Sequence, residues 1–137
     1  MVKGLEARVN PMHEEVRAWG RYRVLDMKQE DSGHLVITGK YFLKPRCNIE
    51  YQCNRRRSKV WVITFGEGEY IHNEKRRRVR AGDVLQIPPG NRHSIRGITE
   101  VEWVEIQAGM GNTEEDEIQL LITWGEIVQQ CGGAYLQ

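Results

Sequence analysis

Short segments rich in β-branched and aromatic residues constrain the fold of this chain more than any other feature. Turn residues such as Gly, Pro, Asn and Asp interrupt them at intervals of about eight to twelve positions. They are RYRVLDM (21–27), GHLVITGKYFL (33–43), NIEYQCN (48–54), KVWVITFG (59–66), DVLQIPP (83–89), HSIRGI (93–98) and EVEWVEIQAG (100–109). GEYIHNEKRRRVR (68–80) is expected to form a hairpin that turns near His72–Asn73. Many short strands with regular turns predict a β-sandwich or β-barrel.

Length and composition fit one globular domain. The chain has 137 residues, of which 39% are hydrophobic and 28% charged, enough for a single core. The formal net charge is +1, so the molecule as a whole has little long-range attraction for nucleic acid. Basic residues nevertheless gather in two clusters, Arg55–Lys59 and Lys75–Arg80.

Cysteine usage and hydropathy indicate a reducing compartment. Cys47, Cys53 and Cys131 form neither an even set nor a C-x-x-C motif, which argues against a disulfide framework. No apolar run approaches the length of a membrane span, and no secretory signal is recognisable. We therefore expect a cytoplasmic protein without a membrane partner.

The chain ends are less clearly patterned. Residues 1–16 are expected to form an N-terminal arm, 17–125 the barrel and 126–137 a C-terminal tail. Within 113–133, Thr113 and Asp116 suggest a capping box and a helix, whereas IQLLITW also suits a strand. We favour an acidic turn followed by a short strand.

One stretch, GDVLQIPPGNRH, combines glycine, proline and histidine at informative intervals. The spacing of its Gly82, Pro88, Gly90 and His93 resembles that of the second motif of the cupin fold. Gly82 turns the chain into a strand, and Pro89–Gly90 turns it out again. This geometry aims His93 back into the barrel.

Two further stretches, RAWGRYRVL (17–25) and VEIQAG (104–109), are similar to the motifs R-P-W-G-x-Y-x-V-L and I-E-V-Q-S-G. Through these motifs the wider chain resembles the C-terminal domain of bifunctional mannose-1-phosphate guanylyltransferases, the type II mannose-6-phosphate isomerases. YQCNRRRSKVW (51–61) is similar to L-Q-M-H-H-H-R-A-E-H-W, sharing Gln52, Arg57 and Trp61. The resemblance implies an all-β cupin double-stranded β-helix, a jelly-roll barrel in a single domain.

The same resemblance implies a divalent metal held by three histidines and a glutamate. Those positions fall on Asn54, Arg56, Lys59 and His93, and only His93 remains a donor of the expected kind. Arginine and lysine are cations and repel a metal ion. We therefore predict no metal and no cofactor.

Strand alternation then predicts a cationic cavity. If Gln52 and Asn54 point inward, so does Arg56, while Arg55 and Arg57 point outward. Lys59 faces inward or lines the mouth, and Arg92 lies at the rim. A buried guanidinium needs compensation. Either Glu50, Glu69 or Glu105 forms an internal ion pair, or an anionic ligand binds; a register error would instead leave Arg56 in solvent.

Three hypotheses for function follow. The first is a metal-free cupin, a sensor or sequestering protein rather than an enzyme, that binds a phosphorylated sugar or nucleotide. Its ligand-binding residues are Gln52, Asn54, Arg56, Lys59, Arg92, His93 and Glu105. The second is a divergent sugar-phosphate isomerase or epimerase, with His93 as the catalytic base and Arg56 and Lys59 as the phosphate clamp. The third is a basic interaction or nucleic-acid-binding module.

The third hypothesis ranks last because the 75–80 run contains no aromatic residue for base stacking. Two roles are possible for the basic residues 75–80. They either protect an exposed sheet edge from aggregation, or extend the anion site and meet a partner subunit. The resemblance to cupins implies a homodimer.

Overall fold

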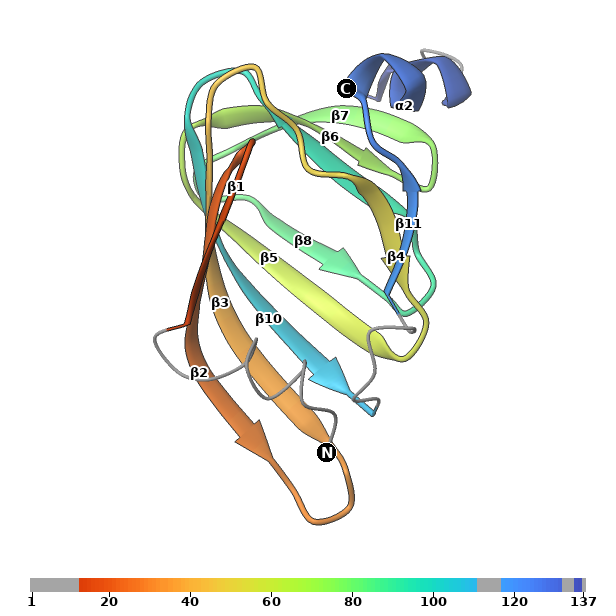
Figure 1. Ribbon diagram of the computed structural model, residues 1–137. Helices are drawn as coiled ribbons and strands as arrows, with labels where there is room; N and C mark the ends of the chain where they lie inside the picture. The colour runs from red at the N-terminus through yellow and green to blue at the C-terminus, as the bar shows by residue number, and fades with distance from the viewer. Residues whose placement is uncertain (1–12, 111–116, 132–134, 137) are drawn as a thin grey trace.

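Two six-stranded sheets make up the barrel in the computed structural model, which describes residues 13–110, 117–131 and 135–136 (Figure 1). The first sheet has the order β1 (Glu14–Arg17), β2 (Gly20–Gln29), β3 (Leu35–Leu43), β10 (Val101–Gly109), β5 (Arg57–Phe65), β8 (Val84–Ile87). The second has the order β11 (Glu117–Leu121), β4 (Tyr51–Asn54), β9 (His93–Gly97), β6 (Glu67–His72), β7 (Lys75–Arg80), β12 (Tyr135–Leu136). Only the β12–β7 pairing between named strands is parallel. The predicted all-β barrel is confirmed.

Aromatic side chains between the two sheets form the main core. Trp61 and Trp103 are completely buried, with ring centroids 4.9 Å apart. Tyr41 stacks on Trp103 at 4.7 Å, and Tyr70 of the second sheet lies 5.9 Å from Trp61. These contacts join the sheets across the barrel interior.

Cross-strand register fixes which side chains share the inner face. In the first sheet one inward row is Glu105–Trp61–Leu85, and in the second sheet one inward row is Ile95–Tyr70–Arg77. Because strand residues alternate between faces, the positions two residues away in each strand also point inward.

The predicted turns occur where expected. The β6–β7 hairpin turns at Asn73 and Glu74, whose φ angles of 47° and 72° are those of a tight two-residue hairpin loop. Gly82 and Gly90 have φ angles of 99° and 81°, which glycine adopts without strain.

The ends of the chain differ from the prediction. Residues 14–16, expected to belong to an arm, lie in β1 and pair with β2. The expected short strand near the C-terminus is present as β11, and it is followed by α2 (Trp124–Gln130), a helix within the 113–133 stretch for which we favoured a turn and a strand. The capping box of α2 joins Thr123 and Glu126; the suggested Thr113–Asp116 box lies outside the described residues.

Helix α2 packs against the outer face of the second sheet (Figure 1). Its Ile127 is completely buried in a cluster with Tyr51, Ile71 and Cys131. The helix therefore covers one sheet from outside and leaves the barrel interior to the strands. Among the described residues, no helix has the length and apolar character needed to cross a membrane.

Candidate functional site

The turn between β4 and β5 decides which arginine enters the barrel. The side-chain Oδ1 of Asn54 accepts hydrogen bonds from the backbone N–H groups of Arg56 and Arg57, both at 2.9 Å. This turn occupies Arg55 and Arg56 and shifts the alternation by one residue. Arg57 is 6% exposed, whereas Arg56 is exposed. The prediction that Arg56 points inward and Arg57 outward is therefore wrong.

Five of the seven residues proposed for ligand binding are buried. They are Gln52, Asn54, Lys59, His93 and Glu105. Gln52 pairs with His93 across β4 and β9, and the ring of His93 lies 5.3 Å from that of Trp61. The expectation that the turn at Pro89–Gly90 aims His93 into the barrel is confirmed.

A chain of hydrogen bonds runs through this interior. Trp61 Nε1 donates to Glu105 Oε2 at 2.8 Å, and Gln107 Nε2 donates to Glu105 Oε1 at 2.8 Å. Arg57 Nη1 donates to Gln107 Oε1 at 3.0 Å. Lys59 lies opposite Gln107 in the register and diagonal to Glu105. The buried cations thus share their face with the carboxylate of Glu105, one of the internal partners considered from the sequence.

Arg92 lies apart from these groups. Its guanidinium hydrogen-bonds Tyr51, which raises the pKa of Arg92, and Nη2 lies 3.5 Å from Glu74 Oε1. Tyr51 belongs to the cluster beneath α2 on the outer face, and its burial raises the pKa of its hydroxyl. The structure therefore does not bring Arg92 together with Lys59 and His93.

The donor set at the expected metal positions does not fit a divalent cation. The Asn54 carboxamide oxygen already accepts two backbone hydrogen bonds, and Lys59 adds a buried side chain that is ordinarily cationic. No group of three His, Cys, Asp or Glu side chains within the described ranges is placed to hold a metal ion. His93 alone supplies an imidazole, which is too few donors for a zinc or iron site.

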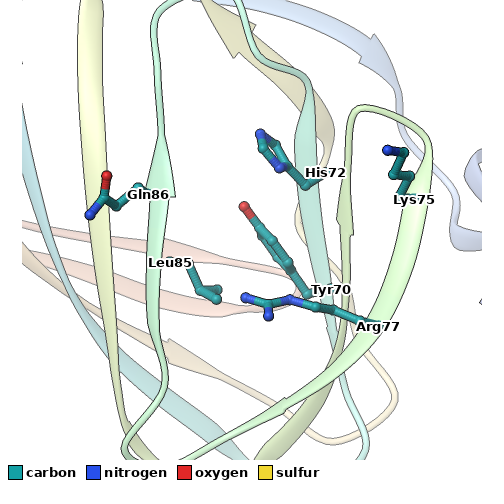
Figure 2. A pocket seen from close by; sticks show the side chains of 6 residues that line it. All are labelled: Tyr70, His72, Lys75, Arg77, Leu85 and Gln86. Carbon is teal, nitrogen blue, oxygen red and sulfur yellow. The ribbon is translucent and has the colours of Figure 1, made fainter. Parts of the chain in front are cut away.

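A pocket of about 240 Å³ lies between the β6–β7 hairpin and β8 (Figure 2). Its lining residues are Tyr70, His72, Lys75, Arg77, Leu85 and Gln86. Tyr70 adjoins Trp61, so the pocket borders the interior that contains His93. His72, Leu85 and Gln86 were not proposed as site residues from the sequence.

The basic run on β7 is divided between the two faces of the sheet. Arg76 and Arg78 point away from the pocket and lie 2.7 Å from Glu69 and 3.7 Å from Glu67. Lys75 and Arg77 line the pocket, and neither makes an ion pair within the part of the chain that the structure describes. Because strand side chains alternate, some of the basic residues on β7 pair with glutamates on the outer face and others face the pocket.

The Tyr70 hydroxyl is the polar group most clearly available in the pocket. It is buried and has no hydrogen-bond partner among the described residues. Burial raises its pKa strongly, an effect that nearby Arg77 opposes, so the hydroxyl stays protonated and able to donate. The guanidinium of Arg77 lies 5.8 Å from the Tyr70 ring.

A β-barrel of two mainly antiparallel sheets with the Gly82–His93 motif has the architecture of a cupin, and comparison with known proteins assigns the family. Residues 6–121 match the family described as Mannose-6-phosphate isomerase C-terminal. The chain belongs to this family, which confirms the resemblance inferred from the sequence. It is 26% identical over 110 residues to Mannose-1-phosphate guanylyltransferase 2 of Escherichia coli O157:H7. That alignment covers 78% of this chain and 22% of the relative, so the chain spans about a fifth of that protein.

Solved structures support the fold. Bacillus subtilis oxalate decarboxylase OxdC matches with a TM-score of 0.67 at 17% identity, over 90% of this chain and 35% of that one. A variant of Streptomyces PAC13 with uridine matches with a TM-score of 0.62 at 20% identity, over 86% and 92%. CapF of Staphylococcus aureus matches with a TM-score of 0.66 at 14% identity, over 82% and 32%. The cupin double-stranded β-helix is therefore confirmed.

Proposed function

We propose that this protein binds a small phosphorylated ligand in the pocket between the β6–β7 hairpin and β8, as a sensor or sequestering protein. The proposal keeps the anionic ligand predicted from the sequence but moves its site. Arg57 donates to Gln107 and shares the interior with Glu105, whereas the pocket has cationic groups on its own wall. The family is that of a sugar-phosphate isomerase domain, which makes a phosphorylated sugar the first class to test.

One observation supports the proposal above the others: as far as the described residues go, the pocket lining contains Lys75 and Arg77 and no carboxylate. Both side chains are exposed and already solvated, so an anion bound beside them gains charge-assisted hydrogen bonds. A guanidinium grips phosphate with two parallel hydrogen bonds, and an ammonium adds a compact positive charge. The Tyr70 hydroxyl adds a neutral donor from the pocket floor.

Pocket size narrows the class of ligand. A volume of about 240 Å³ lies below the roughly 300–1,000 Å³ typical of sites that enclose drug-sized molecules. A phosphate group with one sugar ring or a short polyol suits such a space better than a dinucleotide. Sugar phosphates and nucleoside monophosphates are therefore the candidates, with any nucleobase outside the pocket.

Thermal-shift measurements with phosphorylated compounds test the proposal. Inorganic phosphate, hexose phosphates, nucleoside monophosphates and cyclic dinucleotides are compared on the parent, Lys75→Ala and Arg78→Ala. We expect monophosphates to raise the melting temperature of the parent and of Arg78→Ala, but much less that of Lys75→Ala. A panel without any shift in the parent, or equal shifts in all three proteins, rejects the proposal.

The alternative is a divergent sugar-phosphate isomerase or epimerase. The observation in its favour is that two groups able to move protons line the pocket together, with the rings of Tyr70 and His72 6.0 Å apart and inclined by 22°. His93, predicted as the base, is completely buried and is not among the residues that line the pocket. Incorporation of solvent deuterium into a hexose phosphate, lost in His72→Phe, would favour this alternative over simple binding.

A further inference from the structure

A backbone amide determines the hydrogen-bonding state of His72. The N–H of Arg92 donates to Asn73 Oδ1 at 2.9 Å, which leaves the Asn73 amide nitrogen as a donor. That nitrogen donates to Asn91 Oδ1 at 2.8 Å, so the Asn91 atom facing it is an acceptor. His72 Nε2 lies 2.8 Å from the same oxygen and therefore carries a proton.

This assignment also determines the role of Nδ1, the other ring nitrogen of His72. In a neutral imidazole with a protonated Nε2, Nδ1 is an acceptor. The imidazole of His72 makes no other hydrogen bond within the described ranges, and His72 lines the pocket. Figure 2 shows the Tyr70 hydroxyl pointing toward this imidazole. The pocket thus combines one acceptor on His72 with donors on Tyr70, Lys75 and Arg77.

We infer that His72 is a specificity-determining residue that accepts a hydrogen bond from a ligand hydroxyl, and that Asn91 is the residue that positions it. The inference rests on the proposed function and adds a requirement to it. The Tyr70 hydroxyl has no protein partner among the described residues, so one ligand hydroxyl can accept from Tyr70 and donate to His72 Nδ1. The favoured ligand therefore has a hydroxyl group close to its phosphate.

A matched pair of probes tests this requirement. Ethyl phosphate and 2-hydroxyethyl phosphate differ by one hydroxyl, and isothermal titration at pH 8 keeps imidazoles ordinarily neutral. We expect the hydroxylated probe to bind the parent about fivefold more tightly, the size of one net hydrogen bond. His72→Phe keeps an aromatic ring but lacks the acceptor, and we expect it to bind both probes equally.

The positioning role of Asn91 is read from the state of the ring. Correlation of imidazole nitrogens with carbon-bound protons by NMR distinguishes a protonated Nε2 from a protonated Nδ1. We expect a protonated Nε2 for His72 in the parent and in the control Asn48→Ala. Asn91→Ala is expected to show a mixture of tautomers and to lose the preference between probes, while its melting temperature shows that it is folded.

The possible failures are distinct. If the parent binds neither probe, the proposed function fails. If the parent binds both with equal affinity, or Nδ1 carries the proton, the inference about His72 fails and the binding proposal stands. A preference that persists in His72→Phe places the hydroxyl elsewhere and also contradicts the inference.

Discussion

Trp61 and Glu105 face each other across β5 and β10, and the indole N–H donates to a carboxylate oxygen at 2.8 Å where both side chains are completely buried. The second oxygen of Glu105 accepts from Gln107, which in turn accepts from Arg57. Charged side chains occupy this interior, and hydrogen bonds within the protein satisfy several of their polar atoms. Lys75 and Arg77 beside Tyr70 are instead exposed, and within the described ranges they form no ion pair, so they remain available to an anion.

Glu105→Gln tests the interior chain. An amide has one acceptor oxygen where the carboxylate has two, so one of the hydrogen bonds from Trp61 and Gln107 is lost in a buried site. We expect a loss of about 1–3 kcal/mol in unfolding free energy, measured by urea denaturation. Glu102→Gln is the control, because Glu102 lies on the outer face of the same strand near Lys40 and should change stability by less than about 1 kcal/mol. Equal stability of the two variants contradicts this description.

Arg57→Ala and Arg56→Ala test the turn at Asn54. Removing the buried Arg57 leaves Gln107 Oε1 without its donor and opens a cavity, so we expect a loss of roughly 2 kcal/mol or more in unfolding free energy. Removing the exposed Arg56 should cost about 0.5 kcal/mol or less. Denaturant midpoints of both variants provide the comparison, and the reverse order would restore the inward orientation predicted for Arg56.

The alternating pattern was sufficient for the fold because the long strands of the first sheet bury one face, whereas β4 is buried on both faces. Trp61 and Ile63 in β5, and Trp103 and Glu105 in β10, follow the two-residue period without interruption. The hairpin that turns at Asn73 and Glu74 was also predictable, since Asn tolerates the positive φ angles that the turn requires. Helix α2 was missed because the apolar residues before it also fit a strand.

The site was predicted less well because its residues depend on register. Asn side chains often hydrogen-bond to the backbone in turns. Asn54 could therefore have indicated that the alternation of strand side chains stops before Arg57. Tyr70 and His72 approach Gln86 only because β6 and β8, from different sheets, border the same pocket. No local pattern in the sequence reports such a neighbour across the barrel.

Tyr70→Phe tests how the buried Tyr70 hydroxyl affects stability at neutral and alkaline pH. The hydroxyl has no partner among the described residues, so its removal should leave stability at pH 7 unchanged or slightly raised. Burial raises the pKa of Tyr70, whereas an unfolded tyrosine ionises near pH 10. Above about pH 10 the folded state therefore binds more protons, and the parent loses stability as pH rises.

Urea denaturation of parent and Tyr70→Phe between pH 7 and pH 11 measures this effect. We expect a smaller alkaline loss of stability in the variant. Parallel curves for the two proteins would show that the buried hydroxyl does not contribute to the alkaline loss.

Thr123→Ala tests the cap of α2. Thr123 Oγ1 accepts from the Glu126 backbone N–H at 3.3 Å, and hydrogen bonding to Thr123 lowers the pKa of Glu126. We expect the variant to lose about 1 kcal/mol in unfolding free energy. Thr123→Ser keeps the hydroxyl and should retain most of the stability in the same chemical denaturation experiment. If both variants match the parent, α2 does not depend on this cap.

Isothermal titration of inorganic phosphate into the parent, Arg77→Ala and Arg78→Ala tests the central claim most directly, because these adjacent arginines lie on opposite faces of β7. Loss of a charge-assisted hydrogen bond costs about 1.5–3 kcal/mol, so we expect Arg77→Ala to weaken phosphate binding at least about tenfold. Arg78→Ala should stay within about twofold of the parent. Equal affinities in all three proteins, or no binding by the parent, would contradict a phosphate site in this pocket.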